Sequence, residues 1–210
     1  MHWIDPDSLP EVKGTLERFV LNPHGEVDGF LMTGEKESPI LVHTPPHMDA
    51  ELKKHVKAGD TITVRGVRPR GAELLAAVAV TAQTGHQVID QGPGHHREHP
   101  KAKDKAKDKA DHKKMQAEGT VRLSLFGPKG ELRGALLTDG TVVRIGPKEA
   151  DQIAKLLRSG ARLAVRGDGI EARPGRVIHA KEAGSGLSEL QPIKQPKAKP
   201  KHKHDHEAHA

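Results

Sequence analysis

The hydrophobic and polar positions of the chain follow the same pattern in two separate regions. In the first region, residues 10–90, apolar and polar residues alternate over several short stretches, as they do in half-buried strands. These predicted strands span residues 14–22, 26–32, 39–43, 60–67 and 73–83. A helix is predicted over 45–59, since proline opens this stretch, glycine ends it, and Met48, Leu52 and Val56 form one apolar stripe.

The second region, residues 116–187, predicts the same elements in the same order. Its strands are predicted at residues 119–127, 131–137, 141–145, 161–168 and 175–183. A helix is predicted between the third and fourth of them, at 147–160. Its apolar stripe consists of Ala150, Ile153, Ala154 and Leu157. The chain therefore contains two copies of one β-β-β-α-β-β unit.

Glycines and prolines of the two copies agree in order on both sides of one small gap, four extra residues in the first copy within "GEKESPIL", after which the shift is 101 positions. A shift of 105 positions places "NPHGEVDG" on "GPKGELRG", with Pro23 on Pro128 and Gly25 on Gly130. In each copy this segment predicts a hairpin turn, because proline presets φ at the second turn position and glycine tolerates a positive φ at the fourth. A further glycine, Gly29 or Gly134, lies inside the next strand and indicates a bulge or a sharp bend.

This order of elements predicts an all-β fold with one short helix per repeat. Two tandem five-stranded barrels resembling the OB-fold would account for both copies. The segments "NPHGEVDGFL" followed by "PPH", and "GPKGELRGALLTDGTVV", also resemble a bacterial protein family described as OB-fold nucleic-acid-binding-like. That resemblance implies nucleic-acid binding and identifies no functional residues.

Composition divides the remaining chain into segments without a core. Residues 91–115 form a charged linker rich in His and Lys, and 188–210 form a Lys-, Pro- and His-rich tail. Neither can bury enough apolar surface to offset its ordering entropy, so a flexible linker and a disordered tail are expected. We therefore predict an N-terminal segment at 1–9, an acidic first domain at 10–90 and a basic second domain at 116–187.

Several classes of function are not supported by the sequence. Hydrophobic residues make up 34% of the chain, aromatic residues 2%, and there is no cysteine, which excludes disulfides and thiolate sites. No phosphate-binding loop, nucleophile elbow or zinc-protease motif is present, so we expect a protein that is not an enzyme. We also expect a cytoplasmic protein without a membrane partner, since neither a signal peptide nor a long apolar run is found.

The charge distribution favours binding to single-stranded DNA or RNA. Residues 1–90 hold 9 basic against 13 acidic residues, whereas 116–187 hold 12 against 8. Basic side chains of the second repeat could contact phosphates, with the linker and tail adding flexible cations and one aromatic ring stacking on a base. The candidate residues are Arg122, Arg133, Arg144, Arg166, Arg176, Lys129 and Phe126. Alternatively, these arginines form a solvated face balanced by the acidic first repeat, or the two oppositely charged repeats pack against each other. A further alternative is that the first repeat is a protein-interaction module that orients the second.

Histidine suggests a second function, the binding of Ni²⁺, Zn²⁺ or Cu²⁺. The chain has 15 His, and several of them lie close together in the tail and the linker. The tail candidates are His202, His204, His206 and His209, and the linker cluster is His95, His96 and His99. His47, Glu51 and His55 share one side of the first predicted helix, where a polar stripe facing solvent is the expected role. The sequence indicates no resident cofactor and no oligomeric state.

Overall fold

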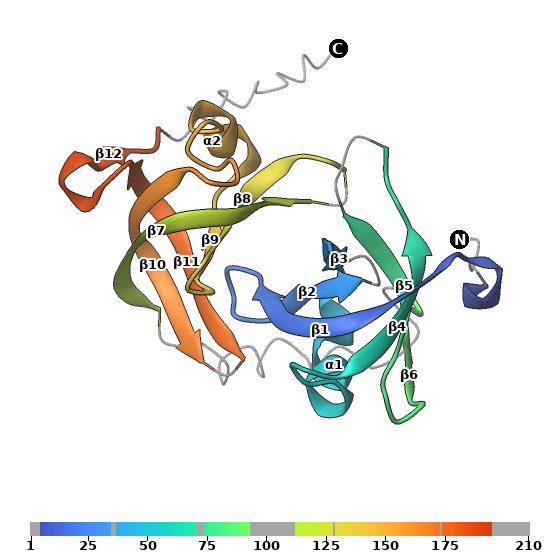
Figure 1. Cartoon of the computed structure of the whole chain (residues 1–210). Coiled ribbons are helices and arrows are strands. Elements are labelled where there is room, and N and C mark those ends of the chain that lie inside the picture. The colour runs from blue at the N-terminus through green and yellow to red at the C-terminus, as the bar shows by residue number, and fades with distance from the viewer. Residues whose placement is uncertain are drawn as a thin grey trace, which may run out of the picture.

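The computed structural model describes residues 5–34, 37–70, 74–92, 112–127, 129–172 and 174–194. These residues form two closed five-stranded barrels side by side, with α1 and α2 at opposite ends of the molecule (Figure 1). The predicted fold class is confirmed: the protein is mainly β, with one short α-helix between the third and fourth strands of each barrel.

The first barrel consists of strands that pair in the order β3-β2-β1-β4-β5. Its strands are β1 (Glu11–Leu21), β2 (Val27–Gly34), β3 (Pro39–His43), β4 (Thr61–Val67) and β5 (Leu75–Thr81). A parallel pairing between β3 and β5 closes the barrel. This order, with β1 between β2 and β4, is that of an OB-fold.

The second barrel repeats this topology strand by strand. Its strands are β7 (Lys113–Phe126), β8 (Leu132–Leu137), β9 (Val142–Arg144), β10 (Arg162–Ala172) and β11 (Gly175–Gly184). Here β7 pairs with β8 and β10, and a parallel pairing between β9 and β11 closes the barrel.

The helices are shorter than the sequence pattern predicts. In the first barrel a 3₁₀ turn, η2 (Pro46–Met48), leads into α1 (Asp49–His55), and the backbone becomes extended at Val56. In the second barrel α2 (Pro147–Gln152) ends where Ile153 leaves the helical region, and the chain continues as turns. The predicted apolar stripes nevertheless face the core, with Met48, Leu52 and Val56 buried in one barrel and Ala150 and Leu157 in the other.

Several short elements extend the barrels beyond the predicted boundaries. A sixth strand, β6 (Gln87–Ile89), pairs with β5, and β12 (Gln191–Pro192) pairs with β11. Two further 3₁₀ turns, η1 (Pro6–Ser8) and η4 (Leu187–Glu189), flank the barrels in the chain. β7 begins at Lys113, inside the range predicted as linker, because backbone pairing with β10 requires no apolar side chain. The rest of that linker, residues 93–111, and the tail from 195 onward lie outside the described residues.

One turn geometry closes five hairpins of the described chain. In the first of them the Asn22 N–H donates to the Glu26 carbonyl and the Gly25 N–H donates to the Asn22 carbonyl, with φ of 82° at Gly25. This is a turn followed by a left-handed residue, as predicted for both copies. The same two backbone bonds join residues 34, 37 and 38, residues 82, 85 and 86, residues 127, 130 and 131, and residues 137, 140 and 141.

The glycines within the second strand of each barrel mark bulges, as predicted. The pairing register shifts beside Gly29 in β2 and beside Gly134 in β8. A Cβ at Gly29 would lie 2.3 Å from the Val42 carbonyl oxygen, and one at Gly134 would lie 1.9 Å from that of Val143. Only glycine permits these strands to approach so closely.

The apolar core of the first barrel continues into the second. Leu125, Leu136, Val142, Ile170 and Val177 of the second barrel belong to the same buried cluster as the core of the first. The barrels are therefore joined by a shared apolar contact. Within the described ranges, no helix is long and apolar enough to cross a membrane.

Candidate functional site

Four charged residues on β-bulges lie at or near the junction of the barrels. The register of β1 against β2 skips Glu17 and Asp28, and the register of β7 against β8 skips Arg122 and Arg133. A bulge re-aims the side chain of its extra residue, so these four charges leave the regular alternation of their strands. They occupy equivalent positions in the two repeats, acidic in the first and basic in the second.

Glu17 and Arg122 form an ion pair between the two barrels. The Thr33 hydroxyl also donates to the Glu17 carboxylate, at 2.5 Å. Burial alone would raise the pKa of Glu17, but the hydrogen bonds from Thr33 and Arg122 outweigh it and lower that pKa. The Arg122 guanidinium, a predicted phosphate contact, is thus engaged by a carboxylate of the first barrel.

Arg144 makes a second and more deeply buried connection. Its Nη2 lies 2.5 Å from the Asp28 carboxylate and its Nε donates to the Leu21 carbonyl at 2.8 Å, both in the first barrel. Only 8% of Arg144 is exposed. Burial raises the pKa of Asp28, although the positive charge of Arg144 opposes this shift. In this arrangement Arg144 holds the barrels together and has little surface for contact with a ligand.

A cleft of about 320 Å³ opens beside this ion pair, between the two barrels. The first barrel contributes β2, β3 and the end of β1 to it, and the second barrel contributes β8, β9, the end of β7 and His179 of β11. The polar and aromatic side chains that line it are Asp28, His43, Phe126, Arg133, Arg144 and His179. Three of the seven predicted nucleic-acid-binding residues, Phe126, Arg133 and Arg144, are therefore brought together.

Equivalent positions of the two repeats face each other across this cleft. His43 pairs with Gly29 in the first barrel as Arg144 pairs with Gly134 in the second. The second and third strands of an OB barrel form the face that commonly binds extended polymers. Both barrels turn this face toward the cleft. Burial lowers the pKa of His43, with the negative charge of Asp28 opposing the shift.

Arg133 lines the cleft, and Lys129 lies in the turn that follows β7. The Arg133 side chain is 44% exposed, and its Nη2 lies 2.7 Å from the Glu131 carboxylate. The Arg133 hydrogen bond is the main cause that lowers the pKa of Glu131. Lys129 is exposed in the same turn, and half-buried Phe126 precedes that turn. An exposed ion pair such as Arg133–Glu131 exchanges partners at small cost.

The remaining predicted arginines lie elsewhere. Arg166 on β10 is exposed and pairs with Glu182 of β11. Arg176 donates to the Gln116 carbonyl at 2.7 Å and lines a second cleft between the barrels, which Arg18 also lines. These two residues are thus not part of the cleft that contains Phe126.

Of the predicted histidine groups, the structure describes only the one on the first helix. The tail residues His202, His204, His206 and His209 and the linker group His95, His96 and His99 lie outside the described residues. In the polar stripe on the first helix, Glu51 and His55 remain close, whereas His47 instead contacts Asp90 at 2.9 Å. The sequence interpretation missed His86, which the turn after β5 places against Glu51 and His55.

Comparison with known proteins adds little to this description. Neither a family model nor a curated protein matches the sequence. Among solved structures, a deletion mutant of the single-stranded DNA binding protein from Thermus aquaticus is 13% identical, over 88% of this chain and 96% of that one, with a TM-score of 0.27. The wild-type protein is 15% identical, over 90% and 94%, with a TM-score of 0.25. At such TM-scores the likeness carries no argument, so the OB-like assignment rests on strand order.

Proposed function

We propose that this protein binds single-stranded nucleic acid, DNA or RNA, in the cleft between its barrels and catalyses no reaction. The observation that supports this most directly is the composition of the cleft. It combines an aromatic ring, Phe126 at the end of β7, with the exposed guanidinium of Arg133 on β8, beside the second and third strands of both OB-like barrels.

The size of the cleft favours an unpaired strand. A volume of about 320 Å³ is at the lower end of the range of roughly 300–1,000 Å³ that small-molecule sites occupy. Such a space accepts an unpaired base and excludes a duplex. We propose that Phe126 stacks on the base while Arg133 and Lys129 contact the neighbouring phosphates.

The other basic residues have different proposed roles. Arg122 and Arg144 fix the relative position of the barrels, and so shape the cleft. Arg166 and Arg176 are proposed to contact phosphates of a longer strand outside the cleft. The linker and tail add cations that strengthen binding without selecting a sequence.

Fluorescence anisotropy with labelled single- and double-stranded DNA and RNA, measured across salt concentrations, tests this proposal. Replacing Phe126→Ala should weaken binding of single strands about tenfold, since stacking contributes roughly 1–3 kcal/mol per base. Replacing Arg133→Ala should weaken binding and reduce the salt slope by about one charge. A chain ending at Lys194 reports the contribution of the tail.

Arg162→Ala provides the matched control. This arginine lies in the same barrel, is 63% exposed and pairs with Glu118, and it is not among the residues that line the cleft. Its replacement should leave affinity nearly unchanged. Absence of binding to any single strand at low salt would refute the proposal, as would an equal loss in the Arg162 and Arg133 variants.

A further inference from the structure

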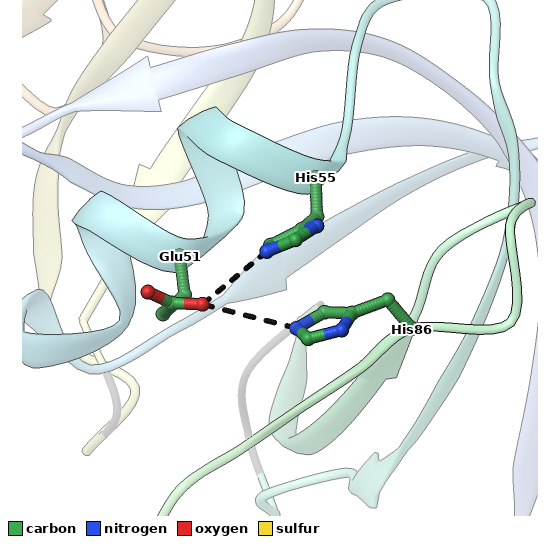
Figure 2. Close-up of side chains that lie close together, drawn as sticks. All are labelled: Glu51, His55 and His86. Atoms are coloured by element: carbon green, nitrogen blue, oxygen red, sulfur yellow. Dashed lines mark ion pairs between the residues drawn. The ribbon is translucent and has the colours of Figure 1, made fainter.

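Three side chains with metal-binding atoms lie close together on the first barrel. They belong to Glu51, His55 and His86. Figure 2 shows Glu51 and His55 on α1 and His86 on the adjacent hairpin, with the three side chains directed toward one another. Their ligand atoms all lie within 4.8 Å of one another. We propose that these residues form a binding site for a divalent transition metal ion such as Zn²⁺.

The donor set and its spacing suit such an ion. Glu51 and His55 are four residues apart on one helix, which places both on the same side. The Glu51 Oε2 lies 3.4 Å from the His55 Nε2 and 3.8 Å from the His86 Nε2. Ligand bonds of about 2.0–2.2 Å in a tetrahedral site place neighbouring donor atoms about 3.4 Å apart, close to the two distances from Glu51.

One donor atom of the cluster forms no hydrogen bond among the described residues. The Nε2 of His55 is buried and, among the described residues, forms no hydrogen bond. Its nearest carboxylate oxygen, on Glu51, is in a geometry that does not make one. A buried polar atom without a hydrogen bond lowers the stability of the fold. A metal ion on the side where Glu51 and His86 lie would provide an interaction for this nitrogen.

The present ring arrangement indicates how the site would close. The His55 and His86 rings are stacked, with centroids 3.6 Å apart and planes inclined by 19°. Because a metal ion lies in the plane of each imidazole that binds it, one ring has to rotate. His86 is the ring that can turn, since its side chain is 43% exposed and lies at the end of a tight hairpin turn.

The number and chemical type of the ligands define the kind of metal site. Two imidazoles and one carboxylate leave at least one coordination position for water or an added ligand, as in three-ligand zinc sites. Imidazole nitrogen suits Zn²⁺, Ni²⁺ and Cu²⁺ better than Mg²⁺ or Ca²⁺. A bound ion would tie α1 to the β5–β6 hairpin, independently of the cleft between the barrels.

The test uses Zn²⁺ and the full chain, in a background where the other dense histidine groups cannot bind it. In that background Gln replaces His95, His96, His99, His202, His204, His206 and His209. Calorimetry should then show one Zn²⁺ per chain, and NMR of the imidazole groups should show shifts at His55 and His86. Glu51→Gln, His55→Asn and His86→Asn should each weaken Zn²⁺ binding at least about tenfold.

His47→Asn is the matched control, because His47 also joins this helical segment to the hairpin, through Asp90, but lies outside the cluster. It should leave Zn²⁺ affinity unchanged. If the background chain binds no Zn²⁺, or if His86→Asn and His47→Asn have the same effect, the site does not exist. His86 lies on an exposed turn, so its variant should fold, and circular dichroism checks this.

Discussion

At the scale of single residues, the glutamate that recurs in the first turn of both repeats, Glu26 and Glu131, makes different hydrogen bonds in each. In the first turn the Asn22 carboxamide oxygen accepts from the backbone N–H of His24, and its nitrogen donates to the Glu26 carboxylate at 2.7 Å. The second turn has Gly127 instead of asparagine, and the Glu131 carboxylate accepts from the Lys129 N–H at 3.0 Å. The glutamate of the second copy thus supplies the acceptor that asparagine provides in the first.

Glu37 occupies a turn position that glycine holds in the other four hairpins. Its φ is 54°, in the left-handed region that costs a residue with a Cβ about 1–2 kcal/mol. Replacing Glu37→Gly should therefore leave stability unchanged or raise it by up to about 1 kcal/mol, once the entropy lost by glycine is subtracted. Urea denaturation measures this difference.

Gly85→Ala is the reciprocal change at the equivalent position of another hairpin. Gly85 has φ of 85°, and a Cβ there would meet nothing within 4 Å, so any cost arises from the backbone alone. We expect a loss of about 1 kcal/mol. If Glu37→Gly destabilises the protein as much as Gly85→Ala does, the backbone explanation is wrong.

At the scale of elements, the turn between the first two strands of each repeat was predictable from the sequence. The same turn between β5 and β6 was not predicted. The turn of "NPHGE" was predicted from Pro23 and Gly25, and the structure has this geometry. The segment "AQTGH", which forms the turn between β5 and β6, carries glycine at the same position but lacks proline. Its glycine was the signal for β6, and hence for the placement of His86 beside α1.

Asp168 links the start of β7, which extends into the predicted linker, to the neighbouring strands. This carboxylate on β10 lies 2.7 Å from Lys114 Nζ at the start of β7 and 2.5 Å from Lys181 Nζ on β11. Hydrogen bonds from these lysines lower its pKa from 3.8 to about 2. A lowered pKa stabilises the fold above pH 3.8, and this contribution is lost as the pH falls toward 2.

Carboxyl NMR during an acid titration should therefore find Asp168 ionised well below pH 3.8. In the Asp168→Asn variant, stability should fall less steeply between pH 4 and 2 than in the unmodified chain. Asp151→Asn, on an exposed residue of α2, is the control and should retain the full slope. A pKa near 3.8 for Asp168 would show that the two lysines do not hold the start of β7.

At the scale of the whole molecule, one pair of equivalent positions of the two repeats meets between the barrels. Glu17 and Arg122 are equivalent positions, 105 residues apart, and they pair with each other. Two identical charges at these equivalent positions would repel each other. The opposite charges of the repeats, visible in the sequence as an acidic and a basic half, make this contact attractive.

The sequence could not show which arginines would be used for packing. Strand alternation predicts faces, but Arg122 is the extra residue of a bulge, and a bulge changes where its side chain points. Arg144 lies in a regular strand, and its tertiary partners, the Asp28 carboxylate and the Leu21 carbonyl, explain its burial. The charge counts thus allowed the prediction that the two halves could pack against each other. The residues that form the contacts could be identified only from the structure.

The two ion pairs between the barrels should differ sharply in strength. Arg144→Ala leaves the Asp28 carboxylate in a mostly buried position without its partner, which should cost about 3–5 kcal/mol. Arg122→Ala removes a more exposed pair and should cost about 0–1 kcal/mol. Equilibrium unfolding measures both, and small-angle scattering reports whether the barrels separate.

The double variant Asp28→Ala, Arg144→Ala should recover part of the loss, because no buried charge remains. If Arg144→Ala costs no more than Arg122→Ala, the buried pair does not hold the barrels together, and the shape of the cleft must depend on the shared apolar core.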